Sequence, residues 1–237
     1  MYICLIKSIT SLFDGVSCGV PHSINIYDAM WVDKLYRAIK RNTTKPFELI
    51  CLVDKEYPIK EPVKQVQFIE QPNTSIGWSL LTEMYRPDII DDRRITMGLD
   101  TIIMDNIDDI LEIDVDIAMI TDPYHPKEVC NPITWCSPET AKVIWDVWTN
   151  KREWVYENCK FIKNAISEMI LLRKLFDQDG EVPRIDNIHE GIYSYSAHMI
   201  DNPDLIETSK IIYFHGYRKP HNLGAYPVDD LIIPHWI

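Results

Sequence analysis

The most restrictive feature of the sequence is a repeated pattern in its first half, where short apolar segments end at an aspartate. Residues 47–53 (FELICLV) end at Asp54, and residues 94–99 end at Asp100. Before them, residues 27–41 place apolar side chains at three- and four-residue intervals with charged ones between, which predicts an amphipathic helix. Strands that alternate with helices predict an α/β layered domain around a largely parallel sheet.

The remaining patterns extend this alternation through one domain. Residues 8–26 contain Gly15, Gly19, Pro21 and several serines without a clear period, which predicts a long loop. Ser137 and Pro138 are typical of a helix start. The other expected elements are strands at 2–6, 66–69, 101–104, 192–197 and 210–215, and helices at 78–85, 107–111, 137–148 and 161–176.

Charge and cysteine content exclude several classes of protein. The chain has 24 Lys and Arg against 36 Asp and Glu, a net charge of −12, which argues against a nucleic-acid partner held by a broad basic surface. No apolar run approaches the roughly 20 residues of a membrane span. The six cysteines form no C-x-x-C pair, which argues against a zinc site and indicates free thiols in a reducing, cytoplasmic setting.

A first group of candidate ligands follows the strand predicted at 94–99. Asp100 stands at the mouth of that strand, and further carboxylates follow it up to Asp109. In parallel sheets ligands lie beyond the carboxyl ends of strands, and hard divalent cations prefer oxygen ligands of this kind. The alternative is a helix cap, which suits Asp105 and Asn106 better than Asp100.

A second group lies in the tail, where residues 211–221 read IIYFHGYRKPH. An apolar strand ends at His215, a good metal ligand, and Gly216 allows a bulky ligand to approach the backbone. Arg218 and Lys219 follow, and a glycine turn before cations suits a phosphate group. The alternative is a surface hairpin with ordinary charges.

Four of the seven tryptophans fall between residues 135 and 154. Packing between helices and the sheet is the simpler explanation of this cluster. The alternative, for one of these rings, is an apolar face offered to a sugar.

Taken in order, these segments resemble the GT-A glycosyltransferases, close to the family-eight group and its bacterial and phage relatives. Residues 31–54 (WVDKLYRAIKRNTTKPFELICLVD) follow the family pattern YVxxLYxxVKRNTTxPFxxVCLTD. Residues 77–87 (GWSLLTEMYRP) are similar to GWxxKxExFRP, and residues 97–103 (MGLDTII) to the metal motif LDxDTVI. Residues 214–221 (FHGYRKPH) match FHGxxKPH, and residues 167–169 (SEM) resemble an acidic step before a helix, often GDQ.

The resemblance implies a GT-A, Rossmann-like fold with a mixed, mostly parallel sheet flanked by helices in a single domain, 1–237. Residues 1–110 would form the nucleotide-binding half and residues 111–237 the half that completes the metal site and meets the acceptor. The implied activity is metal-dependent hexosyl transfer from a UDP-sugar donor to an unidentified glycan, lipid or protein. The implied site residues are Asp100 and His215 for Mn²⁺ or Mg²⁺, Lys7 and Asp54 beside the nucleotide, Gly216 and Lys219 on the phosphates, and Glu168 in catalysis.

The chemistry of the reaction agrees with these assignments. Glycosyl transfer leaves negative charge on the departing diphosphate, and in an acidic protein a metal ion and a lysine offset that charge. Glu168, where it meets the donor sugar, would stabilise positive charge on the sugar carbon or accept a proton from the acceptor. We predict that Glu168 faces the sugar pocket; the alternative is a solvated position on its helix.

The sequence departs from the family pattern at two positions. Gly98 replaces the first aspartate of the metal motif, and Leu81 replaces the lysine that follows the GW pair. These departures leave open a nucleotide-sugar-binding protein that has lost most transfer activity. A nucleotidyltransferase would need a glycine-rich phosphate loop near the first strand, and the spacing of Gly15 and Gly19 does not provide one.

Overall fold

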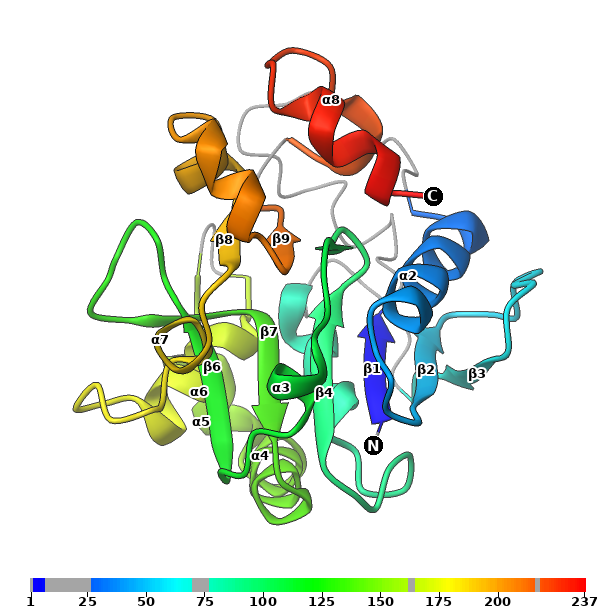
Figure 1. Ribbon diagram of the computed structural model, residues 1–237. Helices are drawn as coiled ribbons and strands as arrows, with labels where there is room; N and C mark the ends of the chain where they lie inside the picture. Colours follow the sequence, from blue (N-terminus) through cyan, green and yellow to red (C-terminus); the bar gives the residue numbers. More distant parts are fainter. Residues whose placement is uncertain (1, 7–26, 70–76, 162–164, 216–217) are drawn as a thin grey trace.

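The computed structural model describes residues 2–6, 27–69, 77–161, 165–215 and 218–237, which form two sheets with helices around them (Figure 1). Lys7, Gly216 and the whole of the expected 8–26 loop lie outside the described residues. The main sheet has the strand order β3-β2-β1-β4-β7-β6, and a smaller sheet has the order β5-β9-β8. The strands are β1 (Tyr2–Ile6), β2 (Glu48–Val53), β3 (Val63–Gln67), β4 (Arg94–Gly98), β5 (Ile102–Ile103), β6 (Ile117–Thr121), β7 (Val129–Cys136), β8 (Ile192–Ser194) and β9 (Ile211–Tyr213).

The main sheet is parallel in one half and antiparallel in the other. Strands β3, β2, β1 and β4 pair in parallel, whereas β7 is antiparallel to both β4 and β6. The structure therefore confirms a mixed α/β architecture, but the sheet is parallel only among its four sequence-predicted strands. Strands β6 and β7 were not expected from the sequence.

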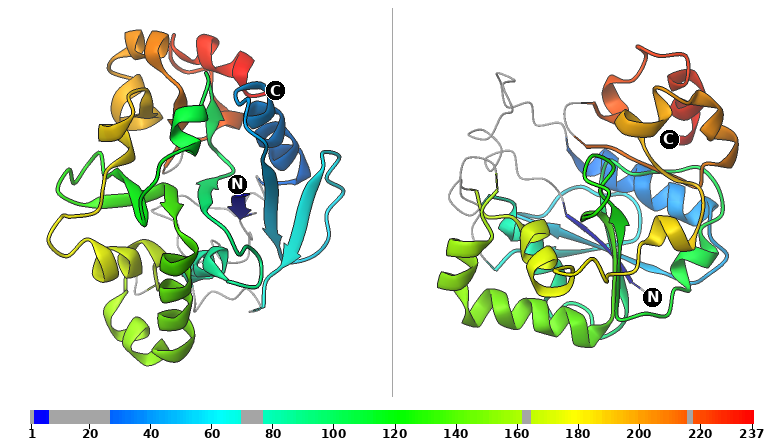
Figure 2. Two further views of the ribbon diagram at one scale, coloured as in Figure 1. Left: turned by 60° about the horizontal axis from the view of Figure 1, so that its bottom comes forward. Right: turned by 90° about the vertical axis from the view of Figure 1, so that its left-hand side faces the viewer.

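Helical layers cover both faces of the main sheet (Figure 2). Alternate residues of β2 point to opposite faces, as the pleat requires. Leu49 and Cys51 join the core under α2 (Ala29–Arg41), and Ile50 joins the core under α4 (Pro138–Asn150) and α6 (Glu168–Phe176). Because both faces are covered, β2 is an uninterrupted apolar run rather than an alternating one.

The remaining helical segments are short and connect these layers. They are the 3₁₀ segment η1 (Gly77–Tyr85), α3 (Asp108–Leu111), α5 (Arg152–Asn158), α7 (Ile185–Ile188), η3 (Tyr195–Met199), η4 (Pro203–Thr208), η5 (Pro220–Asn222), α8 (Asp229–Ile232) and η6 (Ile233–His235). Among the described residues, no helix combines the length and apolar character that crossing a membrane requires.

Two helix predictions have different outcomes. The start of α4 is confirmed, because the Ser137 side chain accepts a hydrogen bond from the Thr140 N–H at 3.2 Å and Pro138 occupies the first turn. The helix expected at 161–176 is wrong in its first half, since α6 begins at Glu168. Residue 161 instead donates its backbone N–H to the carbonyl of Ala165, and the Ser167 N–H bonds to the carbonyl of Cys159, which forms a local antiparallel turn.

The smaller sheet ties the tail of the chain to the segment after β4. Strand β9 pairs antiparallel with β5 and parallel with β8. A separate apolar cluster packs over this sheet, and it joins Ile102 and Phe214 to Tyr195 and to Ile232 of α8. The C-terminal segments therefore form a cap over the edge where β4 ends.

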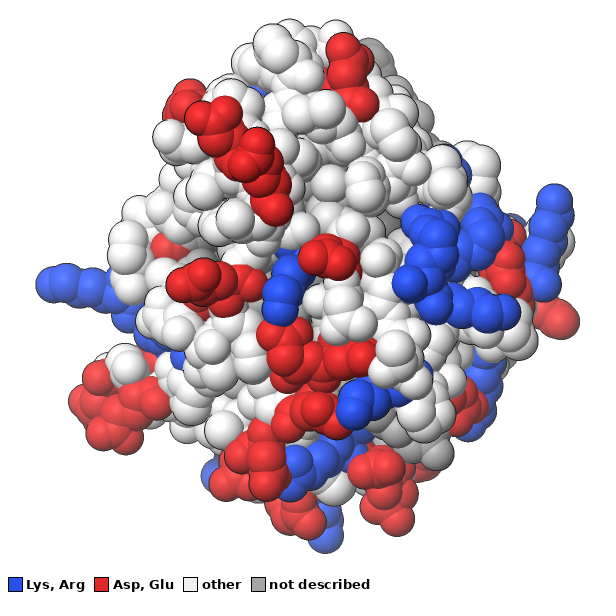
Figure 3. Space-filling view, in the orientation of Figure 1, with Lys and Arg blue, Asp and Glu red and all other residues white. Residues whose placement is uncertain are grey.

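The distribution of charged side chains and the burial of the cysteines can be compared with the sequence-based expectations. Acidic and basic side chains are interspersed on the face in Figure 3, with basic ones gathered over α2. The four cysteines whose side chains are described, Cys51, Cys130, Cys136 and Cys159, are buried and form no disulfide bond with one another.

Candidate functional site

The strand topology places Asp100 and the His215 segment side by side. Asp100 lies two residues after the carboxyl end of β4 and two residues before β5. In the antiparallel pairing of β5 with β9, Ile102 lies opposite Ile212. Because this pairing is antiparallel, the residues that precede β5, including Asp100, and those that follow β9, Phe214 and His215, lie at the same end of the strand pair. Two residues more than 100 positions apart are thus brought to one edge of the fold.

Asp100 is at the centre of this edge. Its Oδ2 accepts a hydrogen bond from the Tyr27 hydroxyl at 3.0 Å and forms an ion pair with Lys219 Nζ. The Asp100 and Lys219 side chains are only 13% and 16% exposed, so the pair is largely shielded from water. Burial and the Asp100 carboxylate raise the pKa of Tyr27, which keeps that hydroxyl a neutral donor.

His215 lies within electrostatic reach of the same pair. Burial and the Lys219 ammonium lower the pKa of His215, while the carboxylates of Asp122 and Asp100 oppose that shift. The imidazole is therefore neutral at neutral pH, which is the form that binds a metal. Its Nε2 lies 3.0 Å from the Tyr124 hydroxyl.

The replacement of an aspartate by Gly98 changes the shape of the site. A Cβ at position 98 would lie 2.6 Å from Asp100 Oδ1, closer than such atoms approach. The Asp100 carboxylate thus occupies space that a side chain at position 98 would need. A second carboxylate here would force Asp100 to move.

The described residues contain no group of three His, Cys, Asp or Glu side chains arranged to hold a metal ion. Asp100 and His215 offer one carboxylate and one neutral imidazole, a mixed set that suits Mn²⁺, and Mg²⁺ with more water or phosphate ligands. The pair fits an ion only when other ligands, such as diphosphate oxygens, complete the coordination.

The segment that carries Lys219 is anchored by a buried carboxylate. Asp229 Oδ2 accepts the backbone N–H groups of residues 224–226 at 2.7, 2.9 and 3.0 Å, and its Oδ1 accepts the Tyr195 hydroxyl at 2.5 Å. The Lys219 N–H also donates to Asn222 Oδ1 at 2.7 Å. These bonds fix the geometry of the loop that follows Lys219.

Glu168 is the first residue of α6, and it is 1% exposed. The alternative that it is a solvated helix position is therefore wrong. Its carboxylate accepts hydrogen bonds from the Tyr85 hydroxyl at 2.7 Å and from the Asn131 amide. Burial raises the pKa of Glu168 to about 7, although both hydrogen bonds favour the charged form. This carboxyl can exchange a proton near neutral pH.

The other predicted residues are less closely linked to this edge. Asp54 follows β2 as expected and accepts a hydrogen bond from the Tyr57 hydroxyl at 2.6 Å. Within the part of the chain that the structure describes, no hydrogen bond or ion pair joins Asp54 or Glu168 to Asp100. Lys7 and Gly216 lie outside that part.

The fold is shared with solved glycosyltransferases. The chain is similar to the glycosyltransferase GlyE of Streptococcus pneumoniae TIGR4, with 10% identity and a TM-score of 0.64 over 99% of this chain and 60% of GlyE. It is also similar to the galactosyltransferase LgtC, solved with donor and acceptor sugar analogues, with 10% identity and a TM-score of 0.60 over 100% of this chain and 95% of LgtC. The bifunctional glycosyltransferase WbbM has 12% identity and a TM-score of 0.60 over 98% of this chain and 51% of its own.

No family model matches the chain, and no curated protein does. The likeness at these identities establishes a glycosyltransferase-like fold. Membership of the family-eight group stays a prediction.

The sequence does not predict three residues that contact the candidate site residues. Tyr27, which bonds Asp100, is expected from the sequence only as the start of a helix, and a separation of 73 positions gives no sign of the contact. Tyr124 lies between β6 and β7, neither of which was predicted. Asn131 lies in β7, so its contact with Glu168 was hidden for the same reason.

Proposed function

We propose that this protein is a glycosyltransferase that moves a hexosyl group from a UDP-sugar to an acceptor hydroxyl on a glycan, lipid or protein. The observation that carries the proposal is the meeting of Asp100, Lys219 and His215, contributed by distant segments, on a fold shared with solved glycosyltransferases. The contacts between these residues support a site for a diphosphate and its counter-cation.

The charges of Asp100 and Lys219 support a donor that contains phosphate groups. Lys219 is paired with Asp100, so the two charges neutralise each other. A diphosphate offers the ammonium a stronger partner than one carboxylate, because its oxygens carry more negative charge. We propose that Lys219 contacts the diphosphate of the bound donor and frees Asp100 Oδ2.

Asp100 and His215 would hold Mn²⁺ or Mg²⁺ together with oxygens of the diphosphate. When bound, such an ion would neutralise negative charge on the departing UDP. Lys7, Asp54 and Gly216 are proposed to border the nucleotide and its phosphates, on the resemblance alone.

Glu168 is proposed as the carboxylate that acts at the sugar. Its pKa of about 7 allows it either to accept a proton or to carry the charge that stabilises a positive sugar carbon. The role requires the side of the carboxylate that bonds Asn131 to face the donor sugar. Tyr85 would then hold the other oxygen in place.

The proposal is tested by incubating the protein with a panel of UDP-sugars, Mn²⁺ and candidate acceptors, and measuring both UDP and glycoside. Asp100→Asn is expected to lower turnover by at least 100-fold. The matched control is Asp105→Asn, an exposed carboxylate of the same segment, which is expected to keep wild-type turnover. Equal turnover in the wild type and in Asp100→Asn would refute the site.

A second candidate function is nucleotide-sugar binding without efficient transfer. Gly98 favours it, because Asp100 and His215 are the two ligands proposed among the described residues, where the family pattern has a further aspartate. A thermal-shift screen of UDP-sugars with and without Mn²⁺ separates the two, since any ligand of the folded state raises the melting temperature. Binding without formation of a glycoside would select this second function.

A further inference from the structure

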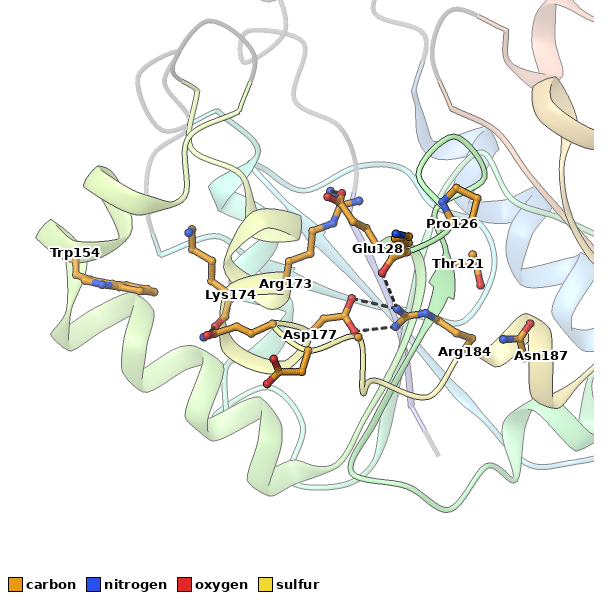
Figure 4. Close-up of a pocket in the computed structure, with 13 residues that line it drawn as sticks. Thr121, Pro126, Glu128, Trp154, Arg173, Lys174, Asp177, Arg184 and Asn187 are labelled. Atoms are coloured by element: carbon orange, nitrogen blue, oxygen red, sulfur yellow. Dashed lines mark hydrogen bonds and ion pairs between the residues drawn. The ribbon is translucent and has the colours of Figure 1, made fainter.

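Trp154, one of the four clustered tryptophans, belongs neither to the core nor to the candidate active site. Trp135 and Trp148 are at most 1% exposed and Trp145 is half-buried, which confirms core packing for these rings. Trp154 on α5 is 38% exposed. It stands at one side of an open hollow of about 1230 Å³, with Asn187 of α7 at the other (Figure 4). An exposed indole beside a hollow is free to contact a ligand.

The floor of the hollow is built from two arginine–carboxylate pairs. Arg184 forms two bonds with Asp177, at 2.9 and 3.2 Å, and the side chains are 11% and 2% exposed. Arg173 donates to Asp122 at 2.8 Å and to the carbonyl of Val129 at 2.6 Å. Groups held this firmly lose little conformational entropy when a ligand binds.

This composition selects the chemistry of the ligand. The guanidinium groups of Arg173 and Arg184 already pair with carboxylates. The lining also carries Lys127, Lys174 and Asp179, so its charges are of both signs and do not form the purely cationic site that suits a phosphate. The polar floor would leave an apolar ligand with unsatisfied groups beneath it. A ligand with one apolar face for an indole and many hydroxyls for planar polar side chains is a carbohydrate. The hollow exceeds the size of a site for a single small ligand, so it has room for several sugar units.

The hollow lies beside the candidate active site and shares a wall with it. Asp122, which binds Arg173, also accepts the backbone N–H groups of Tyr124 and His125 at 2.9 and 3.0 Å. The Tyr124 hydroxyl in turn lies 3.0 Å from His215 Nε2. The loop between β6 and β7 therefore lies between the hollow and the candidate active site, and contacts Arg173 on one side and His215 on the other.

We propose that this hollow binds the non-reacting sugar units of an oligosaccharide acceptor, with Trp154 stacked on one ring and Asn187 bonded to hydroxyls. The acceptor would cross the β6–β7 loop and present its reacting hydroxyl beside His215. This inference rests on the proposed function and narrows its acceptor to a glycan chain.

The test is direct binding to an array of neutral and acidic oligosaccharides, without donor, followed by titration of the best-bound oligosaccharide. Trp154→Ala is expected to weaken binding by at least tenfold and Asn187→Ala by several-fold. Tyr156→Ala, an equally exposed aromatic on the same helix that does not line the hollow, is expected to bind as the wild type does. Trp154→Phe keeps a ring and is expected to restore most of the affinity, which separates loss of stacking from loss of folding.

UDP affinity, measured in parallel, is expected to be unchanged in all four variants. Binding of no oligosaccharide by the wild type, or undiminished binding by Trp154→Ala, would overturn the hollow as a glycan site. Failure of the proposed transferase activity would show separately, as absence of UDP binding and turnover.

Discussion

Replacing Lys219 by methionine is expected to change metal and nucleotide affinity in opposite directions. Methionine keeps the length and apolar stem of lysine but removes the ammonium that pairs with Asp100 Oδ2. In this ion pair the ammonium neutralises the carboxylate proposed to bind the metal. Its removal leaves Asp100 with only the Tyr27 hydroxyl of the two partners on Oδ2.

The magnitude follows from simple electrostatics. An ammonium about 5 Å from a divalent cation repels it by about 1.7 kcal/mol even at the dielectric constant of water. Mn²⁺ affinity without nucleotide should therefore rise by more than about tenfold in Lys219→Met. Loss of one charge-assisted bond to a diphosphate costs about 1.5–3 kcal/mol, so UDP affinity without metal should fall by about 10- to 100-fold.

Free Mn²⁺ is measured by electron paramagnetic resonance, and UDP binding in EDTA by calorimetry. Lys210→Met is the matched control, because Lys210 forms a similar ion pair with Asp109 away from the proposed site. That variant should leave both affinities unchanged. Weaker or unaltered Mn²⁺ binding by Lys219→Met would refute the exchange of Lys219 between Asp100 and the diphosphate.

Four further predictions concern Asp100, Glu168 and Asp229. UDP and Mn²⁺ should each tighten the binding of the other by an equal factor, and an Asp100→Ala protein that keeps Mn²⁺-dependent UDP binding would contradict the role of Asp100 and His215. Glu168→Gln should lower turnover at least 100-fold with UDP affinity nearly unchanged, a result that wild-type turnover would exclude. The pKa of Glu168 is raised to about 7 in the folded protein, so the folded state binds this proton more tightly than the unfolded chain does. The resulting contribution to the unfolding free energy is fully present below about pH 4 and is lost as the pH rises through 7. Between pH 5 and pH 8 the wild type should therefore lose about 2–3 kcal/mol of unfolding free energy relative to Glu168→Gln, and equal pH dependence of the two in urea titrations would disprove that shift. Asp229→Asn should destabilise the protein by about 2–3 kcal/mol, measured by urea unfolding, because an amide cannot accept four hydrogen bonds as a carboxylate does; unchanged stability would show that the loop does not depend on this carboxylate.

Local sequence patterns were sufficient to predict elements in which the apolar residues are continuous or recur at a regular helical spacing. The strand ending at Asp54 and the helix over residues 29–41 are both present, because one is a continuous apolar run and the other a regular amphipathic one. The pattern at 161–176 does not distinguish a helix from an extended segment that precedes one. Ile166 is buried in the core beside α4 and α6 and its backbone pairs antiparallel with Lys160, and α6 begins only at Glu168.

Strand β6 carries the same pattern as the strand before Asp54, since residues 117–121 (IAMIT) precede Asp122, and the sequence prediction overlooked it. Strand β7 has no comparable signal. In β7, Asn131 and Pro132 interrupt the apolar residues, and the strand is recognised only through its antiparallel pairing with β4 and β6. Tyr124 lies between these two strands and Asn131 lies within β7. Without the two strands, the contacts of Tyr124 with His215 and of Asn131 with Glu168 could not be predicted from the sequence.

The sequence by itself determined that the chain layers helices on a sheet, that Asp54 and Asp100 end two strands, and that a histidine and a lysine follow a late one. Only the tertiary structure decided that Lys219 pairs with Asp100, that Glu168 is buried with a raised pKa, and that Trp154 faces a hollow. The reason is physical. Periodicity records which side of an element is buried, but a contact between residues 119 positions apart, such as Asp100 with Lys219, depends on how strands pair and how the C-terminal cap packs.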